Sequence, residues 1–157
     1  MFAQMTHDVG TVVLSNLDAG YRLARWHFRT EREAESAVQE AAERAFREFT
    51  AFSTETGRVW FLRIVSRVCA ERNATHAGSH SENHARRIND VTQLEEAIRT
   101  LPSHLREALV LRELEGLSYQ ELADLMGVSI DTVTVMLSRS RQTLGRALTE
   151  VLVAAEV

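Results

Sequence analysis

The most constraining feature of the sequence is a series of helix-starting and helix-ending residues within positions 117–141. Ser118 and Glu121 have the spacing of a capping box, in which both side chains bind free backbone amides at the start of a helix. Gly127 follows where a left-handed conformation commonly ends a helix, and Ser129 is suited to cap the next one. The segment therefore predicts a short helix, a glycine turn and a second helix.

The apolar residues of the segment favour a helix-turn-helix over an ordinary helical hairpin. Ala123 is small, as two closely crossing helices require, and Val128 is placed to fill the gap between them. One face of the second helix is apolar, with Ile130, Val133, Leu137, Leu144 and Leu148. A helix-turn-helix of this kind places its second helix in the major groove of DNA.

The rest of the chain also shows helical periodicity, and no stretch alternates as a half-buried strand would. Thr30 and Glu33 form a second capping box, which predicts a helix from about residue 30. Upstream, residues 21–28 predict a shorter helix. A further helix is predicted near residues 58–72, with apolar residues and Cys69 on one side and arginines largely on the other. We therefore predict an all-α protein.

Polar residues, glycine and histidine replace the apolar pattern between Asn73 and Asp90, which indicates a linker. The predicted fold is two small helical domains joined by a flexible linker, and the carboxy-terminal domain contains the helix-turn-helix. The domains are expected at residues 1–73 and 94–157, with the linker at 74–93.

The charge distribution is unusual for a chain that binds DNA. The net charge is −4, and all 18 basic residues are arginine. Residues 94–157 hold 6 arginines against 10 acidic residues, so the half with the helix-turn-helix is the acidic half. Any DNA contact must therefore depend on a local group of basic side chains.

Several functional classes are not supported by the sequence. We find neither a nucleophile elbow nor a phosphate-binding glycine loop, so we expect no enzyme activity and no cofactor. A single cysteine excludes an intrachain disulfide. Neither a secretory signal nor an apolar run of about 20 residues is visible, so we expect a cytoplasmic protein without membrane insertion.

Several stretches resemble region 2 and region 4 of the extracytoplasmic-function (group 4) sigma factors of RNA polymerase. The region 4 resemblance is carried by Leu101-Pro102, REALVLR at 106–112, EGLSYQELA at 115–123, MGVS at 126–129 and Thr132-Val133. The region 2 resemblance is carried by EAESAVQE at 33–40, Ala45-Phe46 and RVWFLRI at 58–64.

This resemblance implies an alternative sigma factor that binds core RNA polymerase and directs promoter-specific transcription initiation. It also implies an anti-sigma factor as a partner. The residues expected to contact the polymerase are Glu35, Val38, Gln39, Glu40 and Arg44. Those expected to contact −10 DNA are Arg63, Arg67 and Arg72, and those expected to contact −35 DNA are Ser129, Thr132, Thr134, Val135, Arg139 and Arg141.

The recognition helix departs from the family pattern. Asp131 stands where glycine is typical, and Val135 and Met136 are expected to face DNA although neither donates a hydrogen bond. Both side chains can make apolar contact with thymine methyl groups. Two alternatives follow: a sigma-like protein-interaction regulator (a decoy or adaptor) with weakened DNA reading, and a stand-alone helix-turn-helix regulator of transcription.

A zinc site in the linker is a weaker hypothesis. His76, His80 and His84 recur every four residues and follow Cys69, so a continuous helix would place all four on one face. Gly78, Ser79 and Asn83 are unfavourable for such a helix, and a polar linker rich in histidine is the preferred interpretation.

Overall fold

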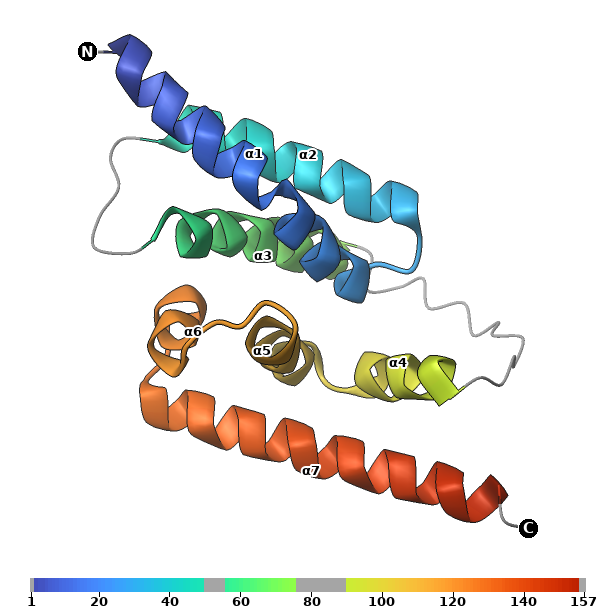
Figure 1. Ribbon diagram of the computed structural model, residues 1–157. Helices are drawn as coiled ribbons and strands as arrows, with labels where there is room; N and C mark the ends of the chain where they lie inside the picture. Colours follow the sequence, from blue (N-terminus) through green and yellow to red (C-terminus); the bar gives the residue numbers. More distant parts are fainter. Residues whose placement is uncertain (1, 50–55, 76–89, 156–157) are drawn as a thin grey trace.

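A computed structural model describes residues 2–49, 56–75 and 90–155 (Figure 1). These residues form seven α-helices, and none of them lies in a β-strand. The all-α prediction is confirmed. Figure 1 shows two layers, with α1, α2 and α3 above the four helices of the carboxy-terminal half. Within the described residues, no helix is both long enough and apolar enough to cross a membrane.

The amino-terminal half consists of α1 (Phe2–His27), α2 (Glu31–Glu48) and α3 (Gly57–Thr75). Helix α1 is much longer than the predicted segment 21–28, because Val9 and Val13 extend its buried face upstream. Gly20 permits a close approach to α3, since a Cβ there would lie 3.2 Å from both Phe61 and Val65. The predicted capping box of α2 is present, with Thr30 accepting a hydrogen bond from the Glu33 amide.

The carboxy-terminal half contains α4 (Asp90–Thr100), α5 (Ser103–Glu113), α6 (Tyr119–Met126) and α7 (Ile130–Ala155). The ends of the predicted linker are helical, because α3 continues to Thr75 and α4 begins at Asp90. Residues 76–89 lie outside the described part of the chain.

The predicted helix-turn-helix is confirmed. Ser118 and Glu121 form their capping box, and Gly127 ends α6 with φ +67°. The Ser129 hydroxyl accepts a hydrogen bond from the Thr132 amide at 3.1 Å, which caps α7. These three local features fix the angle between α6 and α7 and thereby the orientation of the recognition helix.

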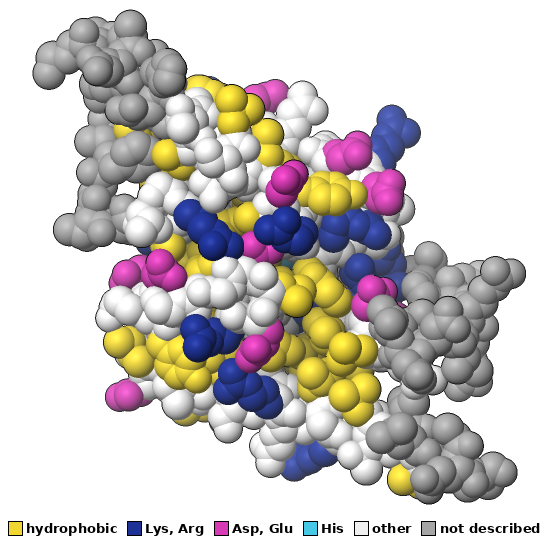
Figure 2. All heavy atoms as spheres, in the orientation of Figure 1, with side chains coloured by type: hydrophobic (Ala, Val, Ile, Leu, Met, Phe, Trp, Pro, Cys, Tyr) yellow, Lys and Arg dark blue, Asp and Glu magenta, His cyan; other side chains and the backbone are white. Residues whose placement is uncertain are grey.

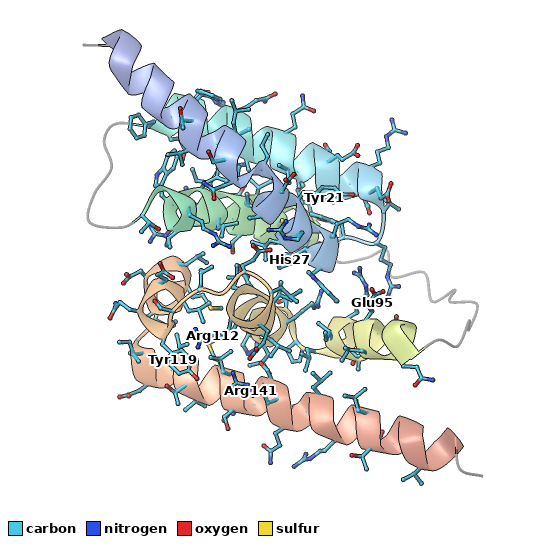
Figure 3. All side chains as sticks on the ribbon, viewed as in Figure 1. Tyr21, His27, Glu95, Arg112, Tyr119 and Arg141 are labelled. Carbon is cyan, nitrogen blue, oxygen red and sulfur yellow. The ribbon has the colours of Figure 1, made fainter. Side chains whose placement is uncertain are left out.

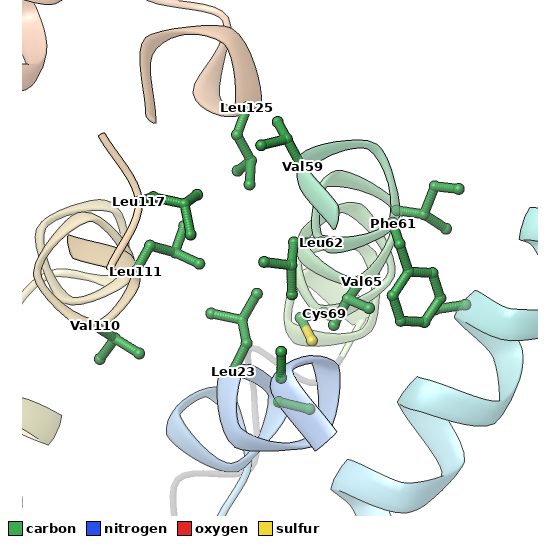
Figure 4. Close-up of a cluster of buried hydrophobic side chains, with 14 of the residues drawn as sticks. Leu23, Val59, Phe61, Leu62, Val65, Cys69, Val110, Leu111, Leu117 and Leu125 are labelled. Carbon is green, nitrogen blue, oxygen red and sulfur yellow. The ribbon is translucent and has the colours of Figure 1, made fainter. Parts of the chain in front are cut away.

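The two halves are packed against one another through a shared apolar core (Figure 4). Leu62 of α3 and Leu23 of α1 lie opposite Leu111 and Leu117 of the carboxy-terminal half, and all four side chains are essentially inaccessible to solvent. Burial of each such side chain on folding contributes about 1.5–3 kcal/mol, and the contact between the halves accounts for part of this value. This packing was not anticipated by the sequence analysis.

Arginines of the carboxy-terminal half bind the end of α1. Arg106 donates to the carbonyl of Trp26 at 2.8 Å, and Arg99 donates to the carbonyl of Arg25 at 2.9 Å. The Arg99 guanidinium also lies 5.3 Å from the centre of the Trp26 ring, within the range of a cation–π contact. The carbonyl groups at the end of α1, which have no partner within the helix, are therefore satisfied by α4 and α5.

A buried polar group lies at the same junction (Figure 3). His27 at the end of α1 lies 3.9 Å from the Glu107 carboxylate of α5, and the Ser66 hydroxyl of α3 donates to that carboxylate. Both nitrogens of His27 lack a hydrogen-bond partner in the described structure. Burial lowers the pKa of His27 to about 4, and the Arg106 charge contributes to this shift. Burial raises the pKa of Glu107.

The depressed pKa of His27 predicts a loss of stability in mild acid. The unfolded chain takes up a proton near pH 6.5, whereas the folded chain does so only near pH 4. The contribution of His27 to the free energy of unfolding should therefore fall by about 3 kcal/mol between these pH values. We expect His27→Phe to remove this fall, measured by urea unfolding at pH 4–7. His104→Phe, at an exposed site, is the control. An unchanged pH profile in His27→Phe would contradict the assignment.

The raised pKa of Glu107 acts in the opposite direction. Its stabilising effect is fully present below the pKa of the unfolded carboxyl and is lost as the pH rises through the folded value. Glu107→Gln keeps an acceptor for Ser66 and removes the charge. We expect Glu107→Gln to be more stable than the natural protein at pH 8, with a difference that shrinks toward pH 4.5. A variant that is less stable at pH 8 would show that the ionised carboxylate is the stabilising form.

Candidate nucleic-acid interface

The first turns of α7 present a polar, solvent-exposed surface. Ser129, Asp131, Thr132, Thr134, Val135, Arg139 and Arg141 are all exposed. Every residue that the sequence analysis assigned to −35 DNA is therefore accessible. The Thr134 hydroxyl donates to the carbonyl of Ile130 at 3.0 Å, so this hydroxyl is already engaged by its own helix. Val135 is half exposed and adds an apolar side chain to the surface.

Two expectations about this helix were wrong. Met136 is 9% exposed and belongs to the core, whereas Ile130 is 43% exposed. The buried face of α7 is centred on Val133, Leu137 and Ser140, and Met136 lies within that arc. Ser140 can be buried there because its hydroxyl donates to the carbonyls of Leu105 and Met136. Met136 is therefore unavailable to DNA or to a protein partner.

Arg139 and Arg141 differ in their surroundings. The Arg141 guanidinium donates to the Glu113 carboxylate at 2.7 Å, and this bond raises the arginine pKa. Figure 3 shows Arg141 near Arg112 and Tyr119, where α5, α6 and α7 meet. Arg139 has no ion pair with any described residue of the chain. Of these two arginines, Arg139 is therefore the more accessible to an external anion.

The outer face of α2 carries part of the expected polymerase-binding set. Glu35 and Gln39 are exposed. Arg44 donates to Glu40, and Arg72 of α3 donates to the same carboxylate, whose pKa is lowered mainly by the Arg72 hydrogen bond. The assignment of Val38 to the polymerase contact is corrected, because its side chain is 7% exposed and packs in the core as part of the apolar face of α2.

The three α3 arginines expected at −10 DNA are held by different partners. Arg63 donates to the carbonyl of Asp124 on α6 at 2.9 Å. Arg67 pairs with Glu48 at 3.5 Å, and Arg72 also binds the Ser36 hydroxyl at 3.0 Å. The structure therefore places Arg67 and Arg72 against α2 and Arg63 against the carboxy-terminal half. It does not bring the three together as one basic patch.

A further group of charged residues was missed by the sequence analysis. Glu115 lies between Arg22 of α1 and Arg58 of α3 and binds both. Arg22 and Glu115 are 93 positions apart, so no local spacing could have indicated the pair. On the face shown in Figure 2, basic side chains form a band across the middle of the molecule, where the two halves meet, with acidic side chains among them.

The described residues do not support the zinc hypothesis. Cys69 is buried, and burial raises the pKa of its thiol to about 12, which disfavours the thiolate that binds metal. In the described segments, no three His, Cys, Asp or Glu side chains are grouped to hold a metal ion. His76, His80 and His84 lie outside the described residues.

Comparison with known proteins agrees with this architecture. A family model for sigma-70, region 4 matches residues 92–144. The extracytoplasmic-function (ECF) RNA polymerase sigma factor SigC of Mycobacterium tuberculosis is 31% identical over 125 residues, which cover 71% of this chain and 68% of SigC. The RNA polymerase sigma-H factor of Pseudomonas aeruginosa is 30% identical over 141 residues, which cover 74% of this chain and 73% of that factor.

A solved structure shows the same fold. The sigma factor RpoE of Bartonella quintana, determined in complex with the anti-sigma factor NepR, superimposes with a TM-score of 0.77 at 22% identity. The match covers 90% of this chain and 97% of that one. The fold, the helix-turn-helix and the similarity over more than two thirds of SigC agree, and the chain belongs to the ECF family of RNA polymerase sigma factors.

Proposed function

We propose that this chain is an alternative sigma factor in which residues 1–73 bind core RNA polymerase and −10 DNA and residues 94–157 bind −35 DNA. The observation that carries the proposal is the capped recognition helix α7, whose exposed residues coincide with those assigned to DNA. The role is one of binding and not of catalysis, and it requires no cofactor. We place the protein in the cytoplasm, where its polymerase would be.

The exposed side chains of α7 can read bases through apolar contacts of their methyl groups and through one hydrogen-bond acceptor. Val135 and the methyl group of Thr134 offer apolar contact to thymine methyls in the major groove. Asp131 offers an acceptor for the exocyclic amine of cytosine. Asp131 also repels phosphate, so backbone affinity on this helix falls mainly to Arg139.

The polymerase contact is proposed for the exposed side of α2. Glu35 and Gln39 stand on this side, and the Arg44–Glu40–Arg72 network ties α2 to α3 beneath it. A surface supported in this way keeps its shape on binding, which reduces the entropy lost when two proteins associate.

Regulation by an anti-sigma factor is part of the proposal. The structure of CnrH in complex with the cytosolic domain of CnrY, like that of RpoE with NepR, has this fold. We therefore propose that an anti-sigma protein binds this chain and covers its α2 or α7 surface.

The direct test is in-vitro transcription with purified core polymerase, a library of promoter fragments and this protein as the only sigma factor. The proposal predicts discrete transcripts that share a −35 and a −10 sequence. Binding to core without initiation would favour the decoy or adaptor alternative. DNA binding without core binding would favour a stand-alone regulator.

Arg139→Ala tests the backbone contact of the recognition helix. We expect promoter binding by the holoenzyme to weaken about tenfold, with the slope of log K against log salt reduced by about 1, because one phosphate contact is lost. Arg47→Ala removes an exposed arginine in the last turn of α2, more than three helical turns from Glu35, and is the matched control. Equal effects of the two substitutions would show that Arg139 acts only through net charge.

Glu35→Arg tests the polymerase contact of α2. Because the Glu35 side chain is exposed, the variant should fold normally and bind core polymerase about tenfold more weakly, a change of about 1.4 kcal/mol. Glu150→Arg on α7 gives the same change of charge and should leave core binding unaltered. Binding should be measured by fluorescence anisotropy of the labelled sigma factor. Unchanged affinity in Glu35→Arg would remove this face from the proposal.

A further inference from the structure

The Glu115 carboxylate is held by two arginines of the other half of the chain. Arg22 donates through Nε and Nη2 to the two carboxylate oxygens, at 2.7 and 3.0 Å. Arg58 donates through Nη2 to one of the same oxygens at 2.8 Å and to the Glu115 backbone carbonyl at 2.7 Å. Two guanidinium groups, from α1 and α3, therefore converge on one anion.

A tight turn after α5 delivers this carboxylate. The amides of Leu114 and Glu115 both donate to the carbonyl of Val110, and the Leu117 amide donates to the carbonyl of Leu111. Gly116 has φ +69°, a left-handed conformation that side-chain-bearing residues rarely adopt. The turn projects from the carboxy-terminal half and places Glu115 between α1 and α3.

The burial of the three side chains is unequal. The Glu115 side chain is completely inaccessible, whereas those of Arg22 and Arg58 are 53% and 42% exposed. The two arginine side chains are therefore partly exposed to solvent, and the Glu115 carboxylate is buried between them. Glu115 neutralises one of the two guanidinium charges, and Asp18 of α1 also lies close enough to Arg22 to interact with it. Hydrogen bonding to Glu115 raises the pKa of Arg22, so its guanidinium remains charged.

We propose that Arg22 and Arg58 form a binding site for a backbone phosphate of nucleic acid, which Glu115 occupies while the two halves are packed together. A carboxylate and a phosphate offer arginine the same pair of anionic oxygens, so one can replace the other in bidentate contact. Phosphate binding at this site thus competes with docking of the Glu115 turn.

A second contact supports this competition. Arg63 lies on α3 five residues beyond Arg58, and it donates to the Asp124 carbonyl of α6. Docking of the carboxy-terminal half therefore engages two arginines of α3 as well as Arg22. This site rests on the proposed DNA binding by residues 1–73 and adds to it a contact that differs from base reading by α7, because it binds backbone phosphate without regard to sequence.

Glu115→Gln is the principal test. The full-length variant keeps the side-chain shape and loses the competing charge. We expect it to bind a fluorescein-labelled 20-base-pair duplex of mixed sequence about tenfold more tightly at low salt, with a steeper salt dependence. Glu150→Gln makes the same change of charge at an exposed site and should alter affinity less than twofold.

The double variant Arg22→Gln/Arg58→Gln separates the phosphate site from simple opening of the interface. It removes the same ion pairs, so it loosens the docked turn as Glu115→Gln does, but it should not bind the duplex more tightly. Adding Glu115→Gln to it should give no gain. An equal gain in this triple variant, or no gain from Glu115→Gln alone, would overturn the proposal.

The natural protein offers a second measurement if Glu115→Gln fails to fold, as judged by circular dichroism. Addition of the same duplex should shift the arginine Nε–Hε resonances of Arg22 and Arg58. A shift of Arg139 without one of Arg22 or Arg58 would overturn the proposal. Because the duplex has no promoter sequence, these results do not depend on whether α7 reads a −35 element.

Discussion

The junction between the two halves depends on a carboxylate that would be unstable there without its two arginines. A buried, uncompensated carboxylate costs several kcal/mol, so the Glu115 turn can dock only where Arg22 and Arg58 supply opposite charge. Around this ion group lies an apolar contact between Leu62 and the leucines of α5 and the following turn. Burial of these leucines favours docking of the two halves, and the ion group joins the Glu115 turn to α1 and α3. The positions of α6 and α7 relative to α3 follow from this arrangement.

Other polar groups at the junction weaken it. His27 is buried without a hydrogen-bond partner in the described structure. Burial lowers the pKa of His27 and raises the pKa of Glu107, so it favours the neutral form of each side chain. Such groups reduce the free energy of docking. A contact that is apolar at its centre but carries this penalty fits a sigma factor, whose two DNA-binding parts must reach separate promoter elements. Under the proposed function, the halves would stay together in the free chain and separate on promoter DNA.

Local features of the fold were predictable from sequence, and long-range ones were not. The capping boxes at Thr30 and Ser118 and the left-handed Gly127 depend on residues within a few positions, and all three are present. Met136 was misplaced because a one-residue rotation of the apolar arc of α7 decides whether it faces the core. The Glu115 group joins residues that are 93 and 57 positions apart in the sequence, so no local pattern could indicate it. The family resemblance assigned DNA contact to α3 but gave no sign that α6 covers part of it.

The central claim is that the two halves of the free chain are held in one defined arrangement. Spin labels at Glu43 on α2 and Gln142 on α7, both exposed positions, would report it directly after Cys69→Val removes the native thiol. Pulsed dipolar spectroscopy on the free protein should give one narrow distance distribution, which lengthens when core polymerase and promoter DNA are added. A broad distribution in the free protein, unchanged by polymerase and DNA, would contradict the account.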